Sequence, residues 1–128
     1  MSTRNRTAGH NWERECRSLF RDSGIFPDCE TSRFESKRMD DAKVDLCGTG
    51  RYYFQCKNVA TRCNYVDILD QMPKDGHRNI ILEKLTKRTG SRFVTRGRFV
   101  HMDLETFLNI LNEIHSFHRS TVVSPLDT

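Results

Sequence analysis

An acid and a Gln-x-Lys pair lie on either side of a glycine-rich turn near the middle of the chain. Asp45 sits between two apolar residues, two glycines follow it, and the next segment ends in Gln55-Cys56-Lys57. Glycine accepts positive φ at little cost, so residues 43–57 predict a β-hairpin. An acid, an amide oxygen and an ammonium group brought together at the open edge of a sheet can hold a divalent metal ion and a phosphate.

Side chains alternate between the two faces of a strand, which sorts the second half of this hairpin. Tyr53, Gln55 and Lys57 share one face, and Phe54 and Cys56 share the other. The second pair is apolar and is expected to face the core. Gln55 and Lys57 therefore point together into a polar space, where Tyr53 either contacts a substrate or closes the edge of the core.

A first helix is predicted over residues 11–23, with Asn11 as its N-terminal cap and Gly24 as its stop. Apolar residues recur in it at helical spacing and predict a buried stripe: Trp12, Cys16, Leu19 and Phe20. Glu13 and Glu15 flank this stripe, one on each edge, so either acid can reach a site beside the helix.

The rest of the chain predicts strands interleaved with helices. The segments are a short strand within 25–31, a polar loop over 32–42, the hairpin, a helix over 63–72, a strand over 78–85, short strands over 92–95 and 98–102, a helix over 103–115 and a tail over 116–128. With the two short strands around Gly97 counted as one, the order αβββαββα predicts one α/β domain spanning residues 1–128, with a central mixed sheet flanked by helices.

Composition agrees with one domain of modest core. The chain has 128 residues and a formal net charge of +4. No apolar run approaches the ~20 residues of a membrane span, and residues 1–10 lack the apolar stretch of a signal peptide. We expect no membrane association and a cytoplasmic location, or a nuclear one in a eukaryote.

The cysteines and histidines show no metal-binding spacing. The five cysteines are an odd number without a C-x-x-C pair, which favours reduced thiols over a disulfide framework or a zinc site. His115-x-x-His118 lies near the tail without further ligands, and the five histidines show no zinc spacing.

Positive charge is clustered, which favours a polyanionic partner such as nucleic acid over evenly solvated faces. One cluster lies in the polar loop and a second lies within residues 84–98. The residues expected to contact phosphates are Arg33, Lys37, Arg38, Arg88, Arg92 and Arg96.

The motifs and their order resemble the PD-(D/E)xK nuclease superfamily, which has a restriction-endonuclease-like fold. The chain is most similar in pattern to archaeal-type Holliday-junction resolvases and related phage and mobile-element nucleases. The resemblance covers residues 8–115. It rests on Asn11-Trp12-Glu13-Arg14-Glu15, Asp45-Leu46, Gln55-Cys56-Lys57 and the closing segment 99–108.

The resemblance implies a Mg²⁺ or Mn²⁺ site. Asp45, Gln55, the Cys56 backbone carbonyl and Glu13 would be the metal ligands, and Lys57 would orient the attacking water. The motif prefers Glu13, whereas periodicity alone places Glu15 almost as well. Asp40 and Asp41 compete with Asp45 for the role of the acid, and Gln71 and Lys74 are candidates for a supporting polar group.

The leading hypothesis is a Mg²⁺-dependent DNA endonuclease from a prokaryote or phage that cuts branched or double-stranded DNA as a homodimer, because two strands need two sites. Most relatives have Glu where this chain has Gln55, and Gln lacks the negative charge. The alternative is therefore a catalytically degenerate DNA-binding subunit of a nuclease or recombination complex. The sequence does not separate DNA from RNA as the substrate.

Overall fold

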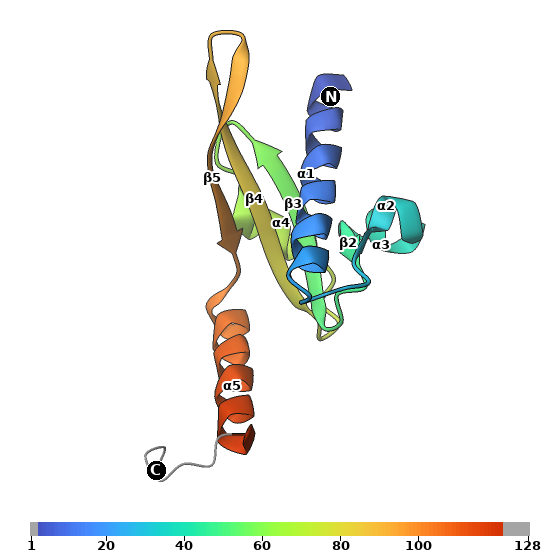
Figure 1. Cartoon of the computed structure of the whole chain (residues 1–128), viewed down its shortest axis with the longest axis vertical. Helices are drawn as coiled ribbons and strands as arrows, with labels where there is room; N and C mark the ends of the chain where they lie inside the picture. The colour runs from blue at the N-terminus through green and yellow to red at the C-terminus, as the bar shows by residue number, and fades with distance from the viewer. Residues whose placement is uncertain (1–2, 122–128) are drawn as a thin grey trace.

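The computed structural model describes residues 3–121. Within that range the chain forms α1 (Thr3–Asp22), β1 (Glu30–Thr31), α2 (Ser32–Glu35), α3 (Lys37–Asp41), β2 (Leu46–Cys47), β3 (Tyr52–Val59), α4 (Tyr65–Gln71), β4 (Arg78–Thr89), β5 (Arg92–His101) and α5 (Leu104–Thr121) (Figure 1). With α2 and α3 set aside, this is the expected order αβββαββα, and the α/β class is confirmed.

The strands form two sheets instead of the single sheet expected. In the larger, mixed sheet, β3 pairs in parallel with β4, and β4 pairs antiparallel with β5. β1 and β2 form a separate antiparallel pair, each only two residues long. The two sheets are joined where the Asp45 N–H donates to the Phe54 carbonyl (2.7 Å). The residue before Asp45 is bonded elsewhere, because the Val44 N–H donates to the Met39 carbonyl of α3 (2.9 Å).

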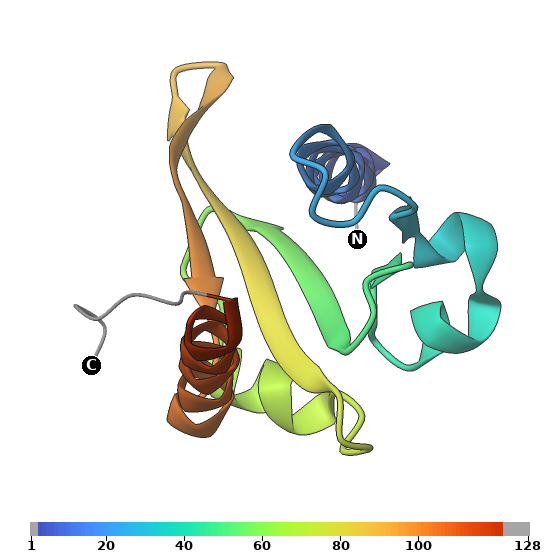
Figure 2. The ribbon, with the colours of Figure 1, turned by 60° about the horizontal axis from the view of Figure 1, so that its bottom comes forward.

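Helices α1 and α4 cover opposite faces of the mixed sheet (Figure 2). On the α1 face, Trp12 and Cys16 pack with Phe54 and Cys56 in the main core. The Trp12 indole N–H donates to the Leu82 carbonyl (2.9 Å), which fixes α1 across β4. The expectation that Phe54 and Cys56 face the core is confirmed, so Gln55 and Lys57 belong to the opposite face.

Two boundaries near the N-terminus differ from expectation. Helix α1 begins at Thr3, so Asn11 lies inside it and is not its cap. The segment predicted as a polar loop forms α2 and α3, where the Ser36 side chain caps α3 by accepting from the Met39 N–H (3.3 Å). These segments carry few apolar residues, so hydrophobic periodicity could not mark them as helical.

The β4–β5 hairpin is longer than predicted. β3 ends opposite Leu85, whereas β4 runs on to Thr89 and pairs there with β5 alone. The two short strands expected around Gly97 are one strand, and the register shifts beside Gly97 between Leu85 and Thr86. Glycine in a strand commonly marks such a bulge and does not end the strand.

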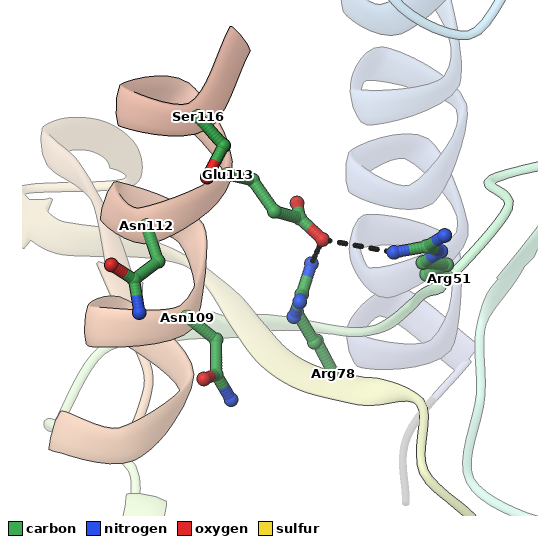
Figure 3. A pocket seen from close by; sticks show the side chains of 6 residues that line it. All are labelled: Arg51, Arg78, Asn109, Asn112, Glu113 and Ser116. Carbon is green, nitrogen blue, oxygen red and sulfur yellow. Dashed lines mark hydrogen bonds and ion pairs between the residues drawn. The ribbon is translucent and has the colours of Figure 1, made fainter. Parts of the chain in front are cut away.

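Helix α5 extends away from the end of β5 (Figure 1) and continues to Thr121, past the predicted start of a tail at residue 116. Residues 122–128 of that tail lie outside the described residues. Ion pairs join Glu113 to Arg51 (3.0 Å) and Arg78 beside a polar pocket (Figure 3). These pairs attach one side of α5 to the turn before β3 and to the start of β4.

The predicted apolar stripe of α5 faces solvent. Its members are between 43% and 64% exposed: Leu104, Phe107, Leu108, Leu111 and Ile114. Among the described residues, no helix combines the length and apolar character that crossing a membrane requires.

Candidate functional site

Asp45 completes the hydrogen bonding of β3 where the paired strand leaves it. Its own N–H donates to the Phe54 carbonyl, and its carboxylate Oδ2 accepts from the Cys56 N–H (2.7 Å). The carboxylate thus takes the place of a strand carbonyl at the edge of β3. Asp45 is 9% exposed, so this is a nearly buried acid held by the backbone between Gln55 and Lys57.

The Cys56 carbonyl points toward the same edge. In a strand, the N–H and C=O of one residue are directed to the same side. Because the Cys56 N–H meets Asp45, the Cys56 carbonyl also lies on the Asp45 side of β3 and not on the β4 side. This orientation is compatible with the expected backbone ligand.

The structure separates the two glutamates that the sequence left open. Glu13 lies beside Asp45, and its side chain is 12% exposed. Glu15 instead pairs with Lys84 (2.9 Å) and Arg98 (3.2 Å) over β4 and β5. Glu13 is therefore the helix acid near Asp45, as the motif favoured.

Two oxygens of the candidate ligands are buried without a hydrogen-bond partner among the described residues. They are Glu13 Oε1 and Gln55 Oε1. Arg33 Nε lies 3.6 Å from Glu13 Oε1, close enough for an ion pair but too far for a good hydrogen bond. Buried polar atoms normally find a partner, so these oxygens are placed as if to accept a group from outside the chain.

The charges around Asp45 favour a bound cation. Burial, followed by the negative charge of Asp45, raises the pKa of Glu13 to about 7. Burial also raises the pKa of Asp45 to about 6, although the Cys56 N–H and the Lys57 ammonium act in the opposite direction. Ionising both acids together is unfavourable in the free protein. A cation bound between them would offset this unfavourable free energy.

The available ligands suit Mg²⁺ or Mn²⁺. Two carboxylates, one amide oxygen and one backbone carbonyl form an all-oxygen donor set, which hard divalent cations prefer. The unpartnered oxygens of Glu13 and Gln55 give that set room for a ligand bond. The residues present therefore fit the metal that the family resemblance implies.

The two other acids on α3 differ in their relation to the candidate site. Asp40 is close enough to raise the pKa of both Glu13 and Asp45 by its charge. Asp41 is exposed at the end of α3. Asp45 alone bonds to the β3 backbone, so it remains the best candidate for the central acid.

The basic residues expected at a phosphate surface are all exposed, but they form two separate regions. One lies on α2 and α3, and the other lies along the β4–β5 hairpin, with α1 between them in both views (Figures 1 and 2). Arg33 differs from the rest because it pairs with Glu13, and so it borders the candidate site itself.

The remaining five candidates have local structural roles or stand apart. The Tyr53 hydroxyl donates to Asp75 (3.0 Å) at the edge of the sheet. The Lys74 ammonium donates to the Leu69 carbonyl (2.6 Å), and Gln71 is exposed at the end of α4. His115 and His118 are exposed on α5, far along the chain from the candidate ligands.

Sequence reasoning missed a second cluster on the α4 face. Cys63, Glu83 and His101 bring a thiol, a carboxylate and an imidazole within 4.8 Å of one another. No spacing rule links residues so far apart in the chain. The available signal was Glu83, an acid in the buried centre of a strand, although its neighbour Lys84 makes this signal weaker than that of Asp45 between Val44 and Leu46.

Comparison with known proteins adds no relative: no family model, curated protein or solved structure matches the chain.

Proposed function

We propose that this protein is a Mg²⁺-dependent DNA endonuclease, similar to Holliday-junction resolvases. The observation that carries the proposal is the pair of neighbouring acids Glu13 and Asp45 beside β3, the strand that carries Gln55 and Lys57. Asp45 is 9% exposed and the Glu13 side chain is 12% exposed. Two acids with raised pKa values, an unpartnered amide oxygen and an ammonium group match what phosphodiester hydrolysis needs. That need is a cation site beside a group that can position water.

Each residue has a role that follows from its chemistry. Asp45, Glu13, Gln55 and the Cys56 carbonyl would hold the ion, which when bound neutralises phosphate charge and polarises the P–O bond. Lys57 would orient the attacking water and stabilise negative charge on the phosphate. Asp45 also has a structural role. Its carboxylate accepts a hydrogen bond from the Cys56 N–H, and this bond holds the carboxylate in position before any ligand binds.

DNA binding is supported by the exposed cations at α2–α3 and along the β4–β5 hairpin. Lys37 and Arg38 are exposed on α3, and Arg88, Arg92 and Arg96 form a second positive surface along the hairpin. Such residues contact phosphates and position a duplex without reading its sequence. We further propose a homodimer through α5, whose apolar stripe is exposed.

The test is cleavage of labelled four-way junction, flap and linear duplex DNA with Mg²⁺ and Mn²⁺, together with a matched RNA duplex. Wild type should cut DNA only with metal, and Lys57→Ala should be slower by roughly 10²–10⁴-fold. DNA binding of this variant should change little. The proposed role would be excluded if Lys57→Ala cut every substrate as fast as wild type, or if wild type cut none of them.

Lys84→Ala is the matched control for this test. Lys84 is a lysine on the neighbouring strand, but it lies on the opposite face, where it pairs with Glu15. This variant should keep wild-type cleavage. Equal losses in both variants would show that the effect comes from general charge or stability and not from the site.

The alternative is a non-catalytic DNA-binding subunit, which Gln55 specifically favours. An amide keeps the oxygen of a glutamate but not its charge, so the metal affinity falls. Salt-sensitive DNA binding by calorimetry without Mn²⁺ binding would support this alternative. Stoichiometric Mn²⁺ binding that Asp45→Ala abolishes would exclude it, and Gln55→Glu should strengthen Mn²⁺ binding in either case.

A further inference from the structure

Cys63, Glu83 and His101 come together from three separate elements on the α4 face of the sheet. Glu83 lies mid-strand in β4, and His101 ends β5 as its diagonal neighbour on the same face. Cys63 lies in the loop before α4. The Sγ, the carboxylate oxygen and the imidazole nitrogen all lie within 4.8 Å of one another.

Glu83 is the most deeply buried of the three. It is only 2% exposed, and a carboxylate at that depth needs compensating partners. One oxygen accepts from the Cys63 N–H (3.0 Å), and the other lies 3.1 Å from His101 Nε2. Tyr65 stacks flat on the His101 ring, with centroids 5.1 Å apart, and so orients it. The carboxylate and the imidazole are therefore held in place before a ligand binds.

The cluster opens on one side into a cavity of about 420 Å³. Arg62, Arg96 and Phe99 line this cavity together with the three clustered residues. A zinc site with three protein ligands and one open position has this form, in contrast to a closed structural site. The two arginines favour water or an oxyanion at the open position.

We propose that Cys63, Glu83 and His101 bind a zinc ion, with the fourth position facing this cavity. Thiolate, imidazole and carboxylate together are ligands that zinc accepts and that Mg²⁺ does not prefer. Ligands at zinc distances of ~2.0–2.3 Å stand about 3.3–3.8 Å apart on a tetrahedron, so small rotations of the side chains close the site. The zinc site is distinct from the all-oxygen site at Asp45 and does not depend on the proposed nuclease function.

A cysteine nucleophile is the competing interpretation of the same residues. Burial and then the Glu83 carboxylate raise the pKa of the Cys63 thiol to about 11. An activated thiol has a lowered pKa, so the arrangement does not suit a nucleophile in the absence of metal. A zinc ion, by contrast, deprotonates a coordinating thiol.

The experiment is a titration of the full-length protein with Co²⁺ as an optical substitute for zinc. One equivalent should produce a near-ultraviolet thiolate-to-cobalt charge-transfer band, and added Zn²⁺ should displace it. Cys63→Ser should abolish the band. Glu83→Gln keeps the shape and the acceptor for the Cys63 N–H, and it should weaken Co²⁺ binding at least tenfold.

Two controls identify the site. Cys47→Ser removes another partly buried free thiol at β2 and should keep the band. Asp45→Asn removes the charge of the oxygen site but keeps an acceptor for the Cys56 N–H, and it should also keep the band. Absence of a band in the folded wild type, or its persistence in Cys63→Ser, would overturn the proposal.

Discussion

Two carboxylates dominate the candidate site at the scale of single residues. Asp45 is fixed by the Cys56 N–H and lies beside Glu13 in a largely buried space. Burial makes ionisation of both carboxyl groups costly, and the charge of Asp45 adds to that cost at Glu13. Glu13 Oε1 has no hydrogen bond among the described residues. Such an arrangement lowers the stability of the free protein in exchange for binding, as functional sites often do.

The pH dependence of unfolding should reveal this cost at Asp45. Its folded-state pKa is raised from 3.8 to about 6, so the folded protein holds the proton more tightly than the unfolded chain. The stabilisation is therefore full below the unfolded pKa and is lost as the pH rises through about 6. Without metal, Asp45→Asn should be about 1–3 kcal/mol more stable than wild type at pH 8, measured by urea unfolding.

Asp41→Asn removes an exposed acid on the neighbouring α3 and should leave this pH profile unchanged. Divalent metal should stabilise wild type at pH 8 but not Asp45→Asn, because the ion replaces the proton. A profile for Asp45→Asn that is as steep as that of wild type would contradict the assignment of the cost to Asp45.

The sequence predicted residues within one strand better than residues on different elements. The period of two grouped Gln55 with Lys57, and an acid between apolar neighbours marked Asp45. Glu13 and Glu15 could not be separated by periodicity, because both flank the same buried stripe. The cluster of Cys63, Glu83 and His101 depends on strand register and on a loop contact, neither of which leaves a spacing signal.

At the scale of elements, the turn between β2 and β3 decides where Asp45 lies. Gly48 has φ +73°, and a Cβ added there would lie 2.5 Å from the Asp28 carbonyl oxygen. Gly50, two residues on, also has positive φ (+60°) but faces open space. Gly48 therefore allows the backbone at Asp28, just before β1, to approach closely. Gly50 only allows the turn itself.

These two glycines offer a matched pair of alanine substitutions. Gly50→Ala should lower the free energy of unfolding by about 1 kcal/mol, through backbone strain alone. Gly48→Ala should lower it by about 2–4 kcal/mol, because strain adds to a clash with backbone. Denaturant unfolding measures both, and equal losses would show that the contact with Asp28 is unimportant.

The predicted boundaries of helices and strands were wrong where the sequence has no apolar periodicity. The first part of α1 and both α2 and α3 consist mainly of polar or charged residues, so no apolar stripe marks them as helical. Of the three, α3 is capped by a side chain, that of Ser36, whereas Thr31 makes no such bond to α2. The two-residue strands β1 and β2 are shorter than any pattern can define. The order of elements could still be predicted, since the longer strands and helices carry regular apolar patterns.

At the scale of the whole molecule, α5 leaves most of its apolar residues exposed to solvent. Its polar side meets the body through Glu113, while its apolar stripe remains exposed. Periodicity correctly identified the stripe but could not show what covers it. A continuous row of exposed leucine, phenylalanine and isoleucine side chains on a small protein indicates an interaction surface.

We propose a second copy of the chain as the occupant, because it would fit both this surface and the proposed activity. A stripe along one helix can pair with its own two-fold mate, so both copies bury the same residues. Two copies would also supply the two sites that cutting two strands needs.

Leu111→Lys places a charge in the middle of the α5 stripe. It should convert a dimer to a monomer in sedimentation experiments, while circular dichroism should show that the fold is retained. Asn112→Lys adds the same charge on the polar side of α5 and should stay dimeric; a monomeric wild type at high concentration would show that another partner covers the stripe.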